Sequence, residues 1–268
     1  MDTILAEQGL RLSYLRNPSR NAAFDPCRIL EDVCQDGMTG AMLPWQNGLR
    51  MAASDHLIVA SGIDDGRCFG VVAASDLATE REPLLFLDAA YLAPAVRASN
   101  LMHRMLAFAI LRVAGYAPVP TVIAACVQTP CYMRMLREFS QRFRAASLFP
   151  AAPDDVVIDL GMASLARRVV RVVRPASRHA ATSMFRFTAG TGAGAARYAA
   201  DDAKAGHRMD ETLVVLDLSM ADDASILDDA RKVYRARPKH AARRDIVDAA
   251  VVADVLQSRR QLPDVTAL

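Results

Sequence analysis

The sequence of 268 residues has little lysine, few aromatic residues and almost no surplus of charge of either sign. Lysine occurs only at Lys204, Lys232 and Lys239, so nearly all of the basic residues are arginine, and the formal net charge is +2. A charge so close to neutral gives no reason to expect nucleic acid or a membrane surface as a partner. Apolar residues still make up 52% of the chain, which is enough for a sizeable core.

Patterns that would indicate metal binding, secretion or membrane insertion are also missing. The five cysteines fit neither a zinc site nor a disulfide framework, and the scattered histidines show no metal-ligand spacing, so we expect no metal. The N-terminal segment lacks the basic start of a signal peptide. The longest uncharged run, 113–133, contains three prolines that would break a spanning helix. We therefore expect a soluble protein in a reducing, cytoplasmic setting.

In the first 150 residues, apolar patterns of strand type alternate with patterns of helix type. Strands are predicted at 10–15, 56–61, 68–75, 84–92 and 121–127. Helices are predicted at 25–43, 99–113 and 130–143. The turn-rich sequence GIDDG joins the second and third strands into a hairpin. This order predicts an α/β fold whose last two strands are joined by a right-handed crossover.

Beyond residue 150 the pattern is weaker. A strand is predicted at about 211–218 and helices at 222–235 and 241–260, whereas 165–174 fits either a helix or a strand. We therefore divide the chain into a core at 1–150 and a C-terminal extension at 151–268 that contributes a strand and helices. The glycine-rich stretch 190–195 lacks the Gly-Lys-Ser/Thr of a phosphate-binding loop and is predicted to be a plain loop.

One segment carries a resemblance to a known family. Residues 91–106, YLAPAVRASNLMHRML, resemble the segment V-x-P-x-x-R-G-x-G-x-G-x-x-L-L that ends the fourth strand of GNAT acyltransferases. The positions that match the motif are Leu92, Pro94, Arg97, Leu101, Met105 and Leu106; its three glycines are replaced by Ala98, Asn100 and Met102. Residues 129–139, TPCYMRMLREF, resemble the helix that follows the fifth strand of the family. The resemblance covers about the first 150 residues and implies a mixed, mostly antiparallel central sheet flanked by helices.

The resemblance also implies a co-substrate, acetyl-CoA or another acyl-CoA. In the family, the pyrophosphate binds to backbone N–H groups at the start of the helix after the fourth strand, where the helix dipole also attracts anions. The matching positions here are Arg97, Ala98, Ser99, Asn100, Leu101 and Met102. The pantetheine arm lies between the splayed fourth and fifth strands and pairs with the backbone of the fourth, which here implies Ala90 and Leu92.

Two side chains are candidates for acid–base chemistry. Members of the family often have a carboxylate on the fourth strand that takes a proton from the amine, and Asp88 holds such a position; alternatively it is a structural carboxylate bound to backbone N–H groups. Strand alternation predicts that Asp88 shares a face with Leu84, Phe86, Ala90 and Leu92. Tyr132 lies about one turn before the family's usual thiolate-protonating tyrosine, and it is either a proton donor or a packing residue.

The first functional hypothesis is therefore an acyl-CoA-dependent N-acyltransferase that acetylates an amine-bearing acceptor by direct attack. The alternative is a non-catalytic GNAT-like module that acts through protein–protein contacts, with a homodimer as one possibility. A nucleic-acid role for the basic segment 231–244 ranks last because acidic residues flank it. His103, in the first turn of the predicted CoA-binding helix, is expected to be a solvated surface residue.

Overall fold

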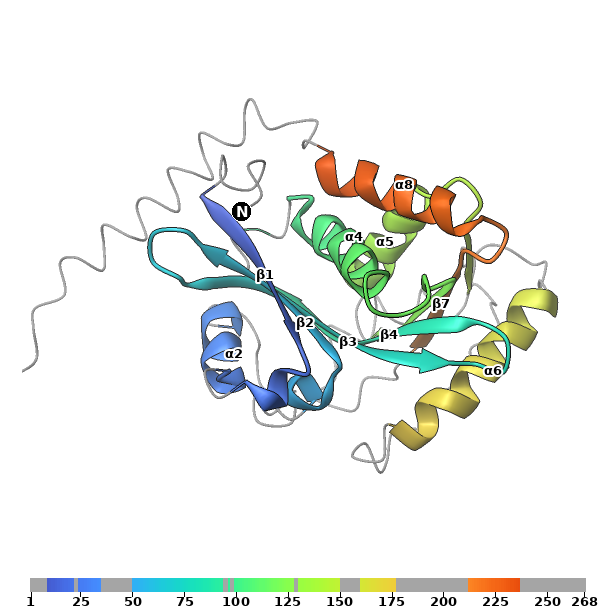
Figure 1. Ribbon diagram of the computed structural model, residues 1–268, viewed down its shortest axis with the longest axis horizontal. Helices are drawn as coiled ribbons and strands as arrows, with labels where there is room; N and C mark the ends of the chain where they lie inside the picture. Colours follow the sequence, from blue (N-terminus) through green and yellow to red (C-terminus); the bar gives the residue numbers. More distant parts are fainter. Residues whose placement is uncertain are drawn as a thin grey trace, which may run out of the picture.

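A computed structural model describes residues 9–21, 24–34, 50–93, 96, 99–127, 130–149, 160–176 and 212–236. Its centre is a seven-stranded sheet with the strand order β1-β2-β3-β4-β5-β7-β6 (Figure 1). The strands are β1 (Leu10–Arg16), β2 (His56–Gly62), β3 (Cys68–Ala78), β4 (Pro83–Leu92), β5 (Val122–Val127), β6 (Ser147–Phe149) and β7 (Thr212–Asp217).

The sheet is antiparallel except at one place. Strands β1 to β4 form an antiparallel meander, β5 runs parallel to β4, and β7 pairs antiparallel with both β5 and β6. The predicted hairpin between the second and third strands is confirmed, and so is the mixed, mostly antiparallel sheet. Strand β7 comes from the C-terminal part of the chain, yet it lies inside the sheet between β5 and β6.

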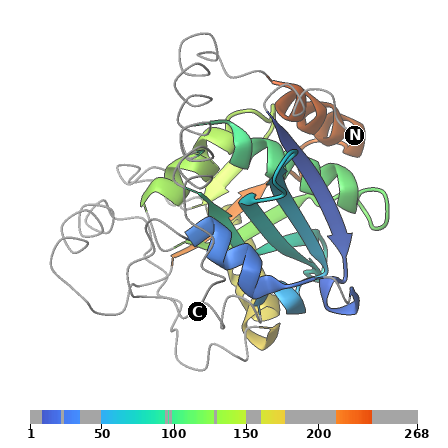
Figure 2. The ribbon, with the colours of Figure 1, turned by 90° about the vertical axis from the view of Figure 1, so that its left-hand side faces the viewer.

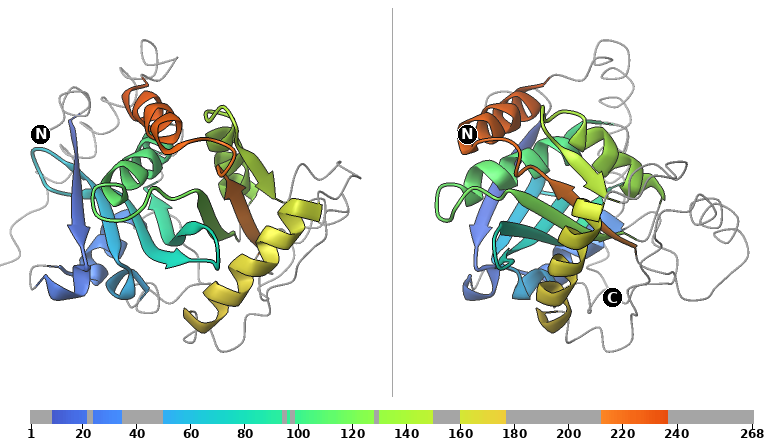
Figure 3. Two further views of the ribbon diagram at one scale, coloured as in Figure 1. Left: turned by 45° about the vertical axis from the view of Figure 1, so that its right-hand side comes forward. Right: turned by 90° about the vertical axis from the view of Figure 1, so that its right-hand side faces the viewer.

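Helices cover both faces of the sheet, as Figures 1 and 2 show. They are α2 (Pro26–Cys34), α4 (Leu101–Val113), α5 (Pro130–Ser140), α6 (Leu160–Ala176) and α8 (Asp223–Arg235). One face packs against α4, α5 and α8 in a single large apolar cluster, which we call the α4 cluster. The other face carries two smaller clusters, one under α2 and one under α6. Helix α6 lies beside β7 at one end of this face (Figure 3).

Helix α4 is the central helix of the fold. Every residue from Leu101 to Ile110 is buried, because the sheet lies on one side of α4 and α8 packs on the other. The Phe108 and Tyr234 rings stack with centroids 5.4 Å apart, and the Arg104 Nε donates a hydrogen bond of 3.0 Å to the Tyr234 carbonyl oxygen. The C-terminal part of the chain therefore completes the core around the helix that carries the predicted CoA motif.

Local signals in the sequence account for several helix boundaries. The Asp25 carboxylate accepts a hydrogen bond of 3.2 Å from the Arg28 backbone N–H at the start of α2, and Asp222 caps α8 through the Ser225 N–H at 2.7 Å. Of the predicted helix at 25–43, residues 26–34 are helical and the rest lies outside the described residues. The ambiguous segment 165–174 lies in helix α6, because its valines pack onto the sheet while Arg167 and Arg171 are exposed.

Candidate active site

The parallel strands β4 and β5 separate partway along their length. Their register runs from the pair Leu84 and Val122 to the pair Leu87 and Ala125, and no later pair joins them within the described residues. Strand β4 continues to Leu92, still paired with β3, and β5 continues to Val127, paired with β7. The two strands thus diverge after Leu87, at the place where the resemblance implies the pantetheine arm.

A β-bulge marks the point of divergence. In the register with β3, Ala73 is opposite Ala89 and Ala74 is opposite Leu87, so Asp88 is the extra residue on β4. This residue reverses the alternation of side chains along the strand. The prediction that Asp88 shares a face with all four residues is therefore wrong for Ala90 and Leu92. Leu84 and Phe86 pack in the cluster under α6, whereas Ala90 and Leu92 pack against the α4 cluster on the opposite face.

Asp88 has a raised pKa. Burial is the largest cause, and the nearby charge of Asp55 adds to it. The Ser75 hydroxyl donates a hydrogen bond of 2.6 Å to the Asp88 Oδ2, and this bond, with the more distant Arg50, opposes the rise. The balance raises the pKa of Asp88 to about 7, and among the described residues no ion pair includes it. A carboxyl group with this pKa exchanges a proton readily at neutral pH.

The pair of Ser75 and Asp88 lies between two apolar clusters. On β4, Phe86 belongs to the α6 cluster and Ala89 to the α2 cluster, and Asp88 comes between them. On β3, Ala73 belongs to the α2 cluster and Leu77 packs against the α6 cluster, with Ser75 between them. The pair thus forms a polar seam on the face of the sheet that carries α2 and α6.

Of the six residues predicted to hold the pyrophosphate, the structure describes Ser99, Asn100, Leu101 and Met102. Arg97 and Ala98 lie outside the described residues, as does Pro94. The Ser99 hydroxyl donates to the Val96 carbonyl at 2.6 Å and accepts from the Leu101 N–H at 3.3 Å. Asn100 has an ordinary φ of −72°, so this replacement of a motif glycine is unstrained, and its side chain makes no capping hydrogen bond to α4.

Met102, the other described replacement of a motif glycine, points into the core. Its side chain is 6% exposed and belongs to the α4 cluster. A methionine that packs inward leaves the outer side of the first helical turn to backbone N–H groups. The side chain that replaces this glycine is therefore part of the core.

The structure adds one residue that the sequence did not suggest, Arg142. It follows α5, and its Nη2 donates a hydrogen bond of 3.4 Å to the Asn100 Oδ1. A guanidinium group thus lies beside the N-terminus of α4, where it adds a full positive charge to the helix dipole. The contact joins residues 42 positions apart, and nothing in the local pattern around Arg142 indicates it.

His103 is buried, so the expectation of a solvated histidine is wrong. It is 5% exposed because α5 packs over it: its Nε2 lies 3.0 Å from the Met135 carbonyl oxygen, and its ring stacks on Phe139. Burial is the main cause that lowers the pKa of His103, and the charge of Arg142 lowers it further. His103 is therefore a neutral packing residue between α4 and α5 at pH 7.

Tyr132, on α5, lies near the opening between the strands. Its pKa is raised by burial first and then by Tyr91, near the end of β4, and Cys126, near the end of β5. Its ring also packs against the α4 cluster. The phenol therefore keeps its proton at neutral pH, and both roles weighed for Tyr132 agree with its position.

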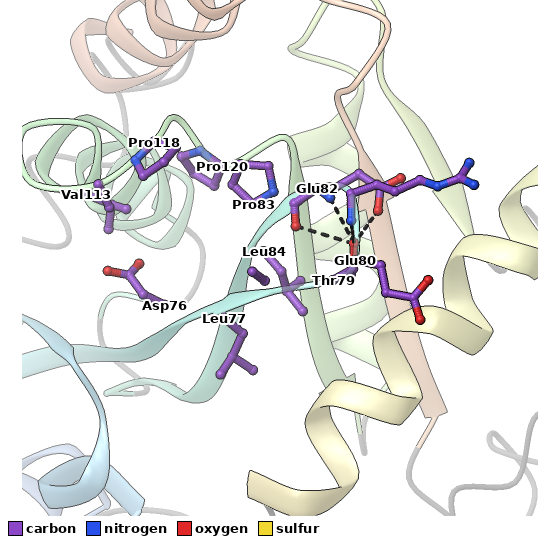
Figure 4. Close-up of a pocket in the computed structure, with 13 residues that line it drawn as sticks. Asp76, Leu77, Thr79, Glu80, Glu82, Pro83, Leu84, Val113, Pro118 and Pro120 are labelled. Atoms are coloured by element: carbon purple, nitrogen blue, oxygen red, sulfur yellow. Dashed lines mark hydrogen bonds between the residues drawn. The ribbon is translucent and has the colours of Figure 1, made fainter.

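A cavity of about 440 Å³ lies near the C-terminal end of α4, under the turn between β3 and β4 (Figure 4). Two of the carboxylates that line it have partners within the protein. Glu82 accepts hydrogen bonds from Thr79 and, at 2.7 Å, from the Arg168 Nη2. Asp76 lies 2.7 Å from the Nε2 of the buried His56, whose Nδ1 is 2.7 Å from the Tyr14 hydroxyl.

No group of three or more His, Cys, Asp or Glu residues in the described part of the chain is arranged to hold a metal ion. No helix among those residues is long and apolar enough to cross a membrane.

No protein-family model and no curated protein matches the sequence. Among solved structures, the chain is similar to diaminobutyrate acetyltransferase EctA from Paenibacillus lautus in complex with L-2,4-diaminobutyric acid and coenzyme A, with a TM-score of 0.43, 15% identity, and coverage of 80% of this chain and 99% of that one. It is also similar to the GNAT family N-acetyltransferase YhbS from Escherichia coli in complex with CoA, with a TM-score of 0.35, 14% identity, and coverage of 47% of this chain and 68% of that one. A third similar structure is an acyl-CoA N-acyltransferase from Pseudomonas aeruginosa, with a TM-score of 0.35, 15% identity, and coverage of 47% of this chain and 86% of that one. The strand order and the divergence of β4 and β5 give the chain the GNAT-like fold that its motif implied.

Proposed function

We propose that this protein is an acyl-CoA-dependent N-acyltransferase, which transfers an acetyl group to an amine by direct attack. The observation that carries the proposal is the position of Asp88. It is the first residue of β4 beyond the last pair with β5, and its pKa of about 7 suits a general base. The chemistry that Asp88 can perform therefore coincides with the opening where the motif implies a thioester.

The residues around the opening fit an acyl-CoA. By the motif, the backbone of β4 at Ala90 and Leu92 would pair with the pantetheine arm, as in the family that the motif resembles, along the edge that diverges from β5 after Leu87. The turn at Ser99, Asn100, Leu101 and Met102 and the guanidinium of Arg142 would hold the pyrophosphate. By the motif alone, Arg97 and Ala98 would also hold the pyrophosphate. The bound acyl-CoA would supply an activated thioester carbonyl.

The protein side of the reaction follows from the protonation states of two groups. The acceptor must lose a proton before or during attack, and Asp88 can accept it at its free oxygen near neutral pH. Backbone N–H groups of β4 beyond Leu87 that face away from β3 would stabilise negative charge on the carbonyl oxygen. Tyr132 keeps its proton because burial raises its pKa, and it would donate that proton to the departing thiolate.

Thermal unfolding with and without acetyl-CoA tests the binding half of the proposal. A ligand at a hundred times its dissociation constant stabilises the folded state by about 2.7 kcal/mol, so the melting temperature should rise. Arg142→Ala should weaken the effect, whereas Arg134→Ala, at an exposed position on the preceding helix α5, should not. A panel of primary amines with acetyl-CoA and a thiol-release assay then tests transfer.

The absence of any effect of acetyl-CoA would favour the non-catalytic alternative. If millimolar acetyl-CoA leaves the melting temperature unchanged and no amine releases CoA, the enzyme proposal is wrong. The chain would then be the non-catalytic GNAT-like module, in which the replaced glycines have ended CoA binding. If acetyl-CoA binds and no amine reacts, the binding half of the proposal holds and transfer to the amines of the panel is wrong.

A further inference from the structure

Asp88 has one direct polar side-chain partner among the described residues, and that partner is Ser75 on the neighbouring strand. The Ser75 Oγ donates a hydrogen bond of 2.6 Å to the Asp88 Oδ2. In the β3–β4 register Ser75 is opposite Phe86, two positions before Asp88, so its hydroxyl reaches diagonally across the bulge. A hydroxyl has a single proton to donate, so only one carboxylate oxygen of Asp88 is held by this bond.

The other charges near Asp88 act at longer range. Asp55 raises the pKa of Asp88 and Arg50 lowers it, both from the segment just before β2. The two helices on this face have their own partners: Asp32 of α2 accepts a hydrogen bond from the Cys68 N–H, and Arg168 of α6 binds Glu82. Among the described residues, Ser75 is thus the side chain that holds the Asp88 carboxylate directly, and its hydrogen bond is the largest influence that opposes burial.

We propose that Ser75 is a positioning residue for Asp88: its hydroxyl fixes the carboxylate at the opening between β4 and β5, favours the ionised form, and leaves Oδ1 to receive the proton of the acceptor amine. This inference rests on the proposed function, because it assumes that Asp88 is the base. It names a residue that neither the motif nor the strand pattern indicates.

The sign of the effect follows from what the hydroxyl does. A donor to a carboxylate stabilises its charged form, so removal of the donor leaves burial and Asp55 opposed only by Arg50, and the pKa of Asp88 rises further. Ser75→Ala should therefore move the acidic limb of the profile of kcat/KM against pH upward. If the limb moves by about one pH unit, kcat/KM of Ser75→Ala is about tenfold lower than that of the wild type at pH values well below the limb. At about pH 9 to 10 the two values should be nearly equal.

The experiment compares three variants over pH 5 to 10. Ser75→Ala should show the shifted limb, and Ser75→Thr, which keeps a hydroxyl, should restore the wild-type limb. Thr79→Val is the matched control, because it removes the hydroxyl that binds Glu82 from the same strand-to-strand region. It should leave the limb where it is. A loss of rate that is equal at every pH in Ser75→Ala, with no rescue by threonine, would overturn the inference.

A second readout does not depend on turnover. Carbon-13 NMR of labelled aspartate carboxyls, with Asp88 assigned by its absence in Asp88→Asn, gives the carboxyl pKa in the protein alone. An unchanged carboxyl pKa in Ser75→Ala overturns the inference, and the base role of Asp88 then stands or falls by its own variant. If the carboxyl pKa rises in Ser75→Ala but the profile of kcat/KM against pH does not move, both the positioning role of Ser75 and the base role of Asp88 are overturned. Acetyl-CoA binding is still judged separately, by thermal unfolding.

Discussion

Glu82 lies just before β4 and Asp88 lies within it, six residues later. Each carboxylate accepts a hydrogen bond from a hydroxyl group in or just after β3, Glu82 from Thr79 and Asp88 from Ser75. Burial raises the pKa of both carboxyls. For Glu82, the bonds from Thr79 and Arg168 outweigh burial, and its pKa falls below the ordinary value. For Asp88, no bound cation opposes burial, and its pKa rises to about 7. The presence of a guanidinium group therefore separates the structural carboxylate just before β4 from the candidate base within β4.

The largest expected difference is in catalysis. Asp88→Asn should lower kcat by about 10²- to 10⁴-fold, the usual contribution of a general base. Glu82→Gln should leave kcat nearly unchanged, because Glu82 lies at the far end of β4 from the opening and is held by Arg168. Steady-state kinetics with the best amine from the panel measures both. Equal losses in the two variants would abolish the distinction between the carboxyls.

The two carboxyls should also give opposite slopes of stability against pH. Asp88 has a pKa of about 7 in the folded protein against an ordinary 3.8, so the folded state holds the proton more tightly than the unfolded state does. The stability that this provides is fully present below pH 3.8 and is lost as the pH rises to about 7. Relative to the wild type, Asp88→Asn should gain up to about 4 kcal/mol between pH 4 and pH 8. Glu82 has a folded-state pKa below 4.5, so its contribution is present above 4.5 and is lost as pH falls.

Urea unfolding of the wild type, Asp88→Asn and Glu82→Gln from about pH 3 to about pH 8 measures these slopes. The advantage of Asp88→Asn over the wild type should grow as the pH rises toward 7. The advantage of the wild type over Glu82→Gln should be constant above 4.5 and should shrink as the pH falls below it. A difference for Asp88→Asn that stays constant with pH would mean that the pKa of Asp88 is ordinary, which removes the reason for assigning it as a base.

The smallest expected effect comes from the ion pair itself. The Arg168 and Glu82 side chains are 22% and 16% exposed and lie 2.7 Å apart, so Arg168→Ala leaves a mostly buried carboxylate with only Thr79 as partner. The free energy of unfolding at pH 7 should fall by about 1–3 kcal/mol. Arg167→Ala, at the exposed neighbouring position, is the control and should change little. Equal effects of the two changes would show that the ion pair adds nothing.

The sequence predicted the elements that have a strong pattern of their own. The first five strands and the helices α4, α5 and α8 follow from apolar periodicity and from caps such as Asp222. The three-residue strand β6 has too short a pattern to be seen, and the arginine–valine sequence of α6 suits either a strand or a helix. The place of β7 between β5 and β6 depends on pairings such as Val215 with Phe149, which no local pattern records.

The candidate site was predictable to the same extent. Asp88 was identified from its strand and the motif, but the bulge that moves Ala90 and Leu92 to the opposite face depends on the register with β3, which alternation alone does not reveal. Ser75 and Arg142 matter through contacts with Asp88 and Asn100, which lie on other elements. Residues whose role comes from such long-range contacts carry no signal in a single sequence.

The position of β7 has a consequence for how the protein forms in the cell. As the chain leaves the ribosome, β5 and β6 are made well before residues 212–217, which lie between them in the finished sheet. Until β7 arrives, one edge of β5 has no neighbour, and an open edge of this kind invites pairing with other chains. Since contacts between residues distant in sequence also slow folding, the nascent protein should spend its most aggregation-prone interval waiting for this strand.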